Sequence, residues 1–297
     1  MPHIPRPFLQ RRDFLRFSLI GAGAAALAAA TGCGLGSASA DEKRIRLIVT
    51  ESAPYQEPTK IAAQLLAEQG WTLEATYVTD IVQPNLAVAN GEFDANFFQH
   101  GAYLQQFNVD KDLDLEPLFY VYGSPGGIWS EKHPSLQELP EGARIALPVD
   151  PANNGRALVL LRDAGLIDLE PGVGVIKVSQ ETITANPRKL QFVEVDQQSL
   201  SKTLPDVDAG FLFVRLAAEI GLTREQALAF EADANQLPFR CVVAGTADFA
   251  ATEKARVLQE AYQSEEVREW FAGYMGGALP TPWDTDPLDE LNQWWQA

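Results

Sequence analysis

Residues 91–104 read GEFDANFFQHGAYL and decide how this chain is interpreted. The apolar run that ends at Phe98 is typical of a short strand, and His100 and Tyr103 follow it in a turn before a helix. In α/β sheets the carboxyl end of a strand is where ligands bind. Aromatic side chains with a polar tip suit a pocket for a small solute. The alternative is that Phe97 and Phe98 pack in a core and His100 is a polar residue satisfied without a ligand.

The composition describes an acidic, globular protein. Apolar residues make up 46% of the 297 residues and charged residues 21%, which is ordinary for a soluble globular protein. The chain is long enough for two modest lobes or one large domain. The formal net charge is −17, and a surface of that sign repels nucleic acid and anionic lipid. The two cysteines, Cys33 and Cys241, stand in different contexts and predict no disulfide framework. No Cys/His cluster has the spacing of metal ligands, so we expect neither a metal nor a cofactor.

Residues 1–40 are expected to be a signal peptide and a tether rather than part of the fold. The pair Arg11-Arg12, followed by DFLR, matches a twin-arginine signal. An ordinary secretory signal with a chance arginine pair is the alternative. The apolar run at 17–30 is rich in alanine and glycine and too short for a stable membrane span. The protein is therefore expected to be exported.

Two processing sites compete at the end of this leader. Residues 30–33 read ATGC and resemble a lipobox, in which Cys33 would be acylated and become the mature N-terminus. Lipid alone would then anchor the protein on the outer face of the cytoplasmic membrane. Residues 38–40 read ASA, and ordinary cleavage after Ala40 would leave a free periplasmic protein. We favour lipidation because Cys33 otherwise has no role.

Strand and helix patterns alternate along the rest of the chain. We expect strands at 45–49, 73–78, 94–98, 115–122, 143–147, 177–178, 191–195, 209–214 and 241–244. We expect helices at 58–69, 84–90, 103–108, 155–164, 198–204, 216–221, 253–262 and 265–274. Such alternation predicts an α/β fold with mostly parallel sheets.

Two breaks divide this pattern into lobes. The glycine-rich stretch 123–127 is the first hinge candidate, and a second crossover is expected between 231 and 238. The first lobe would then comprise 41–123 plus 238–297, and the second lobe 124–237. Two α/β lobes joined by two hinge crossovers predict a periplasmic-binding-protein fold (type II-like) that closes on a ligand in the cleft between them.

Residues 91–104 resemble the signature of the NlpA lipoprotein family, the methionine-binding proteins of ABC importers. Further pieces that fall in the same order are DIVQPN at 80–85, NNGRAL at 153–158, QFVEV at 191–195 and DVDA at 206–209. Several ordered motifs make the resemblance, which covers about residues 44–280, far more specific than any one would be. It implies an extracytoplasmic solute-binding lipoprotein, expected to be monomeric, that delivers a small carboxylate-bearing, amino-acid-like solute to an ABC permease.

Arg156 is the first candidate for binding. It is expected between a strand and a helix, where exposed N–H groups favour an anion and a guanidinium can grip a carboxylate with two hydrogen bonds. The resemblance implies that Arg156 holds the ligand's carboxylate. The alternative is a surface salt bridge.

The resemblance also implies ligand contacts from other segments. Phe98, His100 and Tyr103 match positions around the ligand's side chain, and Asn153 matches the helix-start position. Tyr55 is expected in a loop that faces the cleft, and Glu57 in the same loop is expected to cap a helix instead.

Two positions depart from the family pattern. Phe213 and Cys241 stand where the family has asparagines, one of which helps to bind the ligand's ammonium group. An ammonium buried there without an acceptor would cost several kcal/mol, of which a cation–π contact recovers only about 1–2 kcal/mol. We therefore expect an altered specificity, for a carboxylate or other small anion without an α-amine. Arg215 and Arg240 flank these positions and either add positive charge or point to solvent.

Other readings of the chain stay open. A sensor or orphan receptor would keep the same fold without transport. An enzyme would use His100 as a general base, but no nucleophile motif accompanies it, so we expect no catalytic residue. Cys241 is expected to be a packed thiol. The tail tryptophans Trp283, Trp294 and Trp295 are expected to cover an apolar patch on the first lobe, with a partner contact as the alternative.

Overall fold

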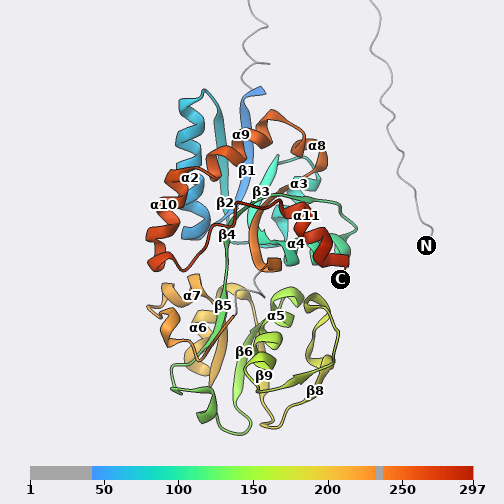
Figure 1. Ribbon diagram of the computed structural model, residues 1–297, viewed down its shortest axis with the longest axis vertical. Coiled ribbons are helices and arrows are strands. Elements are labelled where there is room, and N and C mark those ends of the chain that lie inside the picture. The colour runs from blue at the N-terminus through green and yellow to red at the C-terminus, as the bar shows by residue number, and fades with distance from the viewer. Residues whose placement is uncertain (1–41, 232–236, 297) are drawn as a thin grey trace, which may run out of the picture.

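The computed structural model describes residues 42–231 and 237–296, and its strands there form two five-stranded sheets and one two-stranded sheet. Each large sheet with its helices makes one lobe, and the two lobes lie one above the other along the long axis (Figure 1). The two-lobed α/β architecture expected from the sequence is confirmed. The expectation of mostly parallel sheets was wrong, because half of the strand pairs in the two large sheets are antiparallel. The leader, with Cys33 and both processing sites, lies outside the described residues. Within those residues, no helix combines the length and the apolar character needed to cross a membrane.

Lobe 1 is the sheet of order β2-β1-β3-β12-β4 with the helices that cover it. Its strands are β1 (Arg44–Thr50), β2 (Thr72–Val78), β3 (Ala95–His100), β4 (Glu116–Gly123) and β12 (Arg240–Gly245). β1 runs parallel to β2 and β3, whereas β12 is antiparallel to β3 and β4. Its helices are α2 (Ala53–Glu68), α3 (Gln83–Ala89), α4 (Gly101–Lys111), α8 (Ala247–Ala250), α9 (Glu253–Tyr262), α10 (Glu265–Gly273) and α11 (Pro287–Gln296).

Lobe 2 is the sheet of order β11-β5-β10-β6-β9 with its helices. Its strands are β5 (Gly126–Trp129), β6 (Arg144–Pro148), β9 (Gln191–Val195), β10 (Ala209–Phe213) and β11 (Ala229–Phe230). Its α-helices are α5 (Pro151–Asp163), α6 (Leu200–Thr203) and α7 (Val214–Glu219), and a small hairpin joins β7 (Asp168–Leu169) to β8 (Ile183–Ala185). Single 3₁₀ turns include Val175–Lys177, Gln197–Ser199, Leu237–Phe239 and Tyr274–Gly277.

The chain crosses between the lobes after β4 and again between β11 and β12. The return of residues 241–244 to the first sheet, expected from the sequence, is observed, because β12 lies between β3 and β4. Two glycines of the stretch 123–127, Gly126 and Gly127, lie in strand β5, where neighbouring atoms leave no room for a side chain. A Cβ on Gly126 would lie 2.3 Å from the ring of Phe211, so only glycine lets the strand approach so closely.

Several expected boundaries were wrong. α2 begins at Ala53 instead of Pro58, so Tyr55 lies in its first turn and not in a loop. Glu57 lies inside that helix and forms an ion pair with Lys60 at 2.7 Å, so the capping role is also wrong. Pro54 near the helix start explains the earlier beginning, because its fixed φ suits the first turn.

The strand expected at 177–178 was also wrong, because Val175–Lys177 is a 3₁₀ turn. This turn packs on helix α5 at Gly155, where a Cβ would lie 2.2 Å from the carbonyl oxygen of Val175. Tertiary contact with the helix therefore overrides the strand preference of two valines around Lys177.

The C-terminal tail packs on lobe 1, as expected. Trp283 is half-buried against the core and donates its indole N–H to the carbonyl oxygen of Val121 at 2.7 Å. Leu291 of α11 is fully buried over Gly101, at the start of α4. Trp294 is half-buried, and the side chain of Trp295 lies outside the described part of the structure.

Candidate ligand-binding site

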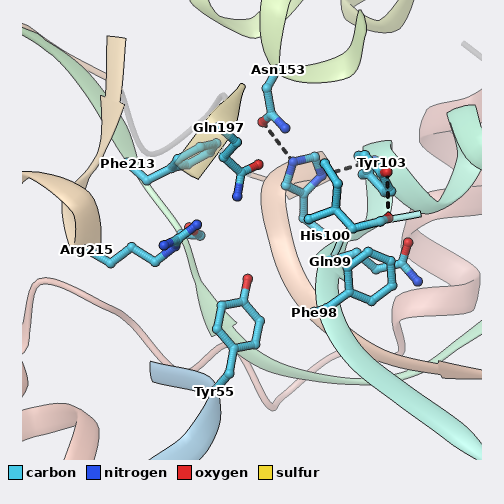
Figure 2. Close-up of a pocket in the computed structure, with 11 residues that line it drawn as sticks. Tyr55, Phe98, Gln99, His100, Tyr103, Asn153, Gln197, Phe213 and Arg215 are labelled. Atoms are coloured by element: carbon cyan, nitrogen blue, oxygen red, sulfur yellow. Dashed lines mark hydrogen bonds between the residues drawn. The ribbon is translucent and has the colours of Figure 1, made fainter. Parts of the chain in front are cut away.

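A pocket lies between the two lobes and takes its wall from both (Figure 2). It encloses about 360 Å³ of empty space, its open mouth included. Six residues that line it belong to lobe 1, one to the first crossover and four to lobe 2: Tyr55, Ile81, Phe98, Gln99, His100 and Tyr103, then Ser124, then Asn153, Gln197, Phe213 and Arg215. The structure thus brings together six of the residues proposed from the sequence, and it leaves Arg156 and Cys241 outside the wall.

His100 bridges the lobes. It is the last residue of β3 and the N-cap of α4, where its Nδ1 accepts a hydrogen bond from the backbone N–H of Tyr103 at 3.1 Å. Its Nε2 lies 2.9 Å from Oδ1 of Asn153, so Nε2 carries the proton and donates. Burial, and then the charge of Arg156, lower the pKa of His100 to about 3. The imidazole is therefore a neutral link between the lobes.

Asn153 lies inside helix α5 instead of in a loop before it. The helix begins at Pro151, and the carboxylate of Asp150 caps it by accepting from the backbone N–H and the Nδ2 of Asn153, at 3.0 and 2.9 Å. At this helix start, where we expected an anionic ligand, the carboxylate of Asp150 therefore already accepts from one of the N–H groups. Because desolvation outweighs these hydrogen bonds, the pKa of Asp150 is raised.

Aromatic rings form one side of the pocket. Phe98 is buried and meets Tyr103 edge to face, with ring centroids 5.8 Å apart. The Tyr103 hydroxyl donates to the carbonyl oxygen of Ile81 at 2.8 Å, which fixes the ring. Gln99 and two asparagines beneath it form a buried amide network, in which Asn85 accepts from Gln99 at 2.6 Å and from Asn96 at 2.9 Å. This network explains why both DIVQPN and the FFQH stretch carry amides.

Tyr55 lies in the wall with Cys241 behind it. The hydroxyl of Tyr55 and the Sγ of Cys241 lie 3.4 Å apart, and both side chains are buried. Burial raises the pKa of the Cys241 thiol, so it stays protonated. The expectation of a packed thiol is confirmed, and Cys241 does not line the pocket but contacts Tyr55, which does.

Arg156 is already paired within the protein. Its Nε and Nη2 each donate to one carboxylate oxygen of Glu231 at 2.5 Å, and Nη2 also donates to the carbonyl oxygen of Ser124 at 2.5 Å. The side chains are 1% and 5% exposed, so this is a buried ion pair and not a surface salt bridge. Its guanidinium carbon also lies 4.0 Å from the centre of the Phe239 ring.

The two arginines beside the altered positions differ in what they do. Arg215 is 4% exposed and lines the pocket, with its guanidinium 5.5 Å from the ring of Phe213. Arg240 instead pairs with Glu290 of the tail at 2.8 Å and does not line the pocket. We expected that both arginines could add positive charge to the site. Arg215 does lie in the pocket wall, whereas for Arg240 the expectation was wrong.

Sequence reasoning missed several residues. Glu231 follows β11, 75 residues after its partner Arg156, and nothing local marks it as that partner. Gln197 of the 3₁₀ turn after β9 and Ser124 of the first crossover also line the pocket. In the described ranges, 42–231 and 237–296, no group of three or more His, Cys, Asp or Glu side chains could hold a metal ion.

Comparisons with known proteins agree on one family. Residues 47–281 match the sequence model of the NlpA lipoprotein family. The D-methionine-binding lipoprotein MetQ of Salmonella typhimurium is 34% identical over 225 residues, which cover 74% of this chain and 82% of that protein.

Solved structures give the same result. A nutrient-binding protein from Burkholderia cenocepacia bound to methionine superposes with a TM-score of 0.76 at 31% identity, covering 80% of this chain and all of that one. A periplasmic substrate-binding protein of an ABC transporter from Coxiella burnetii superposes with a TM-score of 0.74 at 31% identity, covering 80% and 99%. The likeness spans both lobes.

Proposed function

The chain belongs to the NlpA lipoprotein family, and we propose that, as a solute-binding protein of an ABC importer, it captures a small organic carboxylate that has no α-amine. Such a protein works by binding alone: the lobes close on the solute and present the closed form to the permease. The bridge from His100 to Asn153 is the kind of contact that forms on closure, because its partners come from different lobes.

The observation that carries this proposal is the composition of the pocket wall. Among the described residues of the wall, Arg215 is the only charged side chain, and none is Asp or Glu. The amides, hydroxyls and imidazole that accompany it are neutral. The nearest carboxylate to Arg215, that of Glu219, lies 4.0 Å away outside the wall and is half exposed to solvent. A buried cation with so weak a partner favours an anionic ligand and penalises an ammonium.

The altered positions support the loss of the amine. Phe213 lines the pocket and offers a ring where the family has an amide. Cys241 offers a protonated thiol that Tyr55 covers. Neither supplies the acceptor that an α-ammonium group needs, and a buried ammonium without one costs several kcal/mol. Methionine is therefore a poorer ligand in this proposal than an acid of the same shape.

We assign the remaining contacts on this basis. Phe98 and Tyr103 would hold the body of the ligand, and His100 with Asn153 would close the site over it. Tyr55 and Phe213 would complete the wall. Arg156 and Cys241 would act from behind it, since neither lines the pocket.

The setting of the protein follows from the family and from the leader. Export and a lipid anchor at Cys33 fit a lipoprotein family, and the Arg11-Arg12 pair adds the twin-arginine route to the proposal. The protein would act as a monomer, with lobe 1 formed by 41–123 and 238–297 and lobe 2 by 124–237.

A sensor of the same fold would have the same pocket, and importer genes beside this one would favour transport. Catalysis is disfavoured. His100 has a pKa lowered to about 3 and both ring nitrogens engaged, which makes it a poor base near neutral pH. Family membership also points to binding and away from enzyme chemistry.

Three matched probes test the proposal by isothermal titration calorimetry: methionine, its desamino analogue and its decarboxylated analogue. The first carries both charges, the second only the carboxylate and the third only the ammonium. The desamino analogue is expected to bind most tightly and the amine not at all. Tightest binding by methionine would contradict the proposal.

A further inference from the structure

The guanidinium of Arg156 has little capacity left for a ligand. Glu231 occupies both prongs of its fork, and Oε2 of Glu231 also accepts from the backbone N–H of Gly126 at 2.7 Å. Of the three guanidinium nitrogens of Arg156, only Nη1 has no hydrogen-bond partner among the described residues. A ligand carboxylate could reach a single prong at most, and it would lie against the negative charge of Glu231. Two-pronged recognition of a ligand at Arg156 is therefore blocked.

The same contacts make Arg156 a structural link between the two crossovers. Through the carbonyl oxygen of Ser124 it is tied to the first crossover, and through Glu231 to the end of β11, where the second crossover begins. Glu231 in turn accepts from the backbone N–H of Gly126, which ties the pair to the start of β5. Phe239, at the far end of that crossover, stacks on it. The pair of opposite charges is neutral as a whole, so it adds no net attraction for an anion in the pocket.

Arg215 has the capacity that Arg156 lacks. Among the described residues its one ion pair is with Glu219, at 4.0 Å, which is too long for a hydrogen bond, and that carboxylate is half exposed to solvent. Figure 2 shows the guanidinium pointing between Phe213 and Tyr55 into the pocket. Arg215 is 4% exposed and has no hydrogen-bonded acceptor among the described residues. A bound anion would offset the cost of burying its charge.

We infer that the ligand's carboxylate binds Arg215, and that Glu231 determines specificity by keeping Arg156 from it. The inference rests on the proposed function and specifies its ligand further. The ligand carries one anionic group, which lies beside Phe213, and a short apolar body, which lies against Phe98 and Tyr103. A dianion is disfavoured because the wall offers one free guanidinium.

Calorimetry with the desamino analogue of methionine tests this inference in the purified protein. Arg215→Met is expected to weaken binding about 10- to 100-fold, the range for loss of a hydrogen-bonded charged partner. Arg215→Lys keeps the charge but loses the fork, so a smaller loss is expected. Arg240→Met is the matched control: it removes the same net charge from a guanidinium that does not line the pocket, and the affinity should stay within about 2-fold.

Glu231→Gln separates the two arginines. It frees Arg156, so adding it to Arg215→Met should restore part of the lost affinity, and glutarate, a dicarboxylate, should gain affinity in the Glu231→Gln variant alone. Thermal melting shows whether each variant is folded. Unchanged affinity in folded Arg215→Met would overturn the inference while leaving the proposed function intact. If the wild-type protein prefers methionine over its desamino analogue, the proposed function fails instead.

Discussion

The Nε2 atom of His100 in lobe 1 donates to the Oδ1 of Asn153 in lobe 2 across 2.9 Å. Each partner is fixed from its own side, because Tyr103 donates to the other ring nitrogen and Asp150 accepts from the Asn153 amide. The bridge needs a neutral imidazole whose Nδ1 remains an acceptor. The closure of the two lobes is thereby linked to the protonation state of one histidine.

Acid should weaken the folded state through His100. Its pKa is lowered from 6.5 to about 3, so above pH 6.5 both folded and unfolded chains hold it neutral. Between 6.5 and 3 the unfolded chain takes up the proton first, and the free energy of unfolding falls as the pH falls. Removing the histidine removes this contribution.

Denaturant unfolding of the wild type and His100→Gln over a pH series measures the effect. The glutamine can still donate to Asn153. The variant is expected to be less stable above pH 6.5, and the difference should shrink as the pH falls toward about 4. A difference that stays constant over that range would show that His100 does not carry the acid sensitivity.

The buried pair of Arg156 and Glu231 should be costly to break. Glu231→Leu leaves a buried guanidinium without its partner, and the free energy of unfolding is expected to drop by about 3–5 kcal/mol. The double variant Arg156→Met/Glu231→Leu leaves no uncompensated charge and should recover a large part of that loss. Denaturant unfolding of the two single variants and the double variant measures the coupling, and strictly additive losses would contradict it.

Phe213 and Cys241 should respond differently to restoration of an amide. Phe213→Asn places an acceptor in the pocket wall, so the affinity for methionine should rise relative to its desamino analogue. Cys241→Asn buries an amide behind Tyr55, where an unsatisfied polar group costs about 1–3 kcal/mol. That variant should lose stability without gaining affinity. Equal gains from both, by calorimetry and thermal melting, would refute this distinction.

Gly155 should be intolerant of any side chain. A Cβ there would lie 2.2 Å from the carbonyl oxygen of Val175 and 2.8 Å from that of Val178, both backbone atoms that cannot swing away. Gly155→Ala is expected to cost at least about 1–3 kcal/mol, as overpacking does, and to shift Asn153 on the same helix. Gly174→Ala is the control, because nothing lies within 4 Å of its Cβ position. Similar melting temperatures for the two variants would contradict the packing argument.

The sequence predicted most of the framework because its signals are local. Alternating apolar runs marked strands such as 73–78 and 191–195 within a residue or so of their observed ends. The start of α5 was misplaced although a local signal existed: Asp150 followed by Pro151 is a cap followed by a first-turn proline.

The site was less predictable because its decisive contacts are distant in sequence. Six of its proposed residues do line the pocket, and the resemblance to a family supplied them. Glu231 pairs with Arg156 across 75 residues of sequence because the fold brings the two crossovers together, and no local pattern predicts this pair. Arg215 lies two residues after the altered Phe213, and Arg240 lies directly before the altered Cys241. Only the packing of α7 and α11 decides which of the two arginines lines the pocket.

The identity of the bound solute is the central claim, and mass spectrometry tests it most directly. The protein is purified without added ligand, its intact mass is measured under native conditions, and the released molecule is identified after denaturation. The account predicts a small organic acid with a single carboxylate and no amine, which Arg215→Met no longer retains. Methionine, or any other α-amino acid, released from the wild-type protein would contradict it.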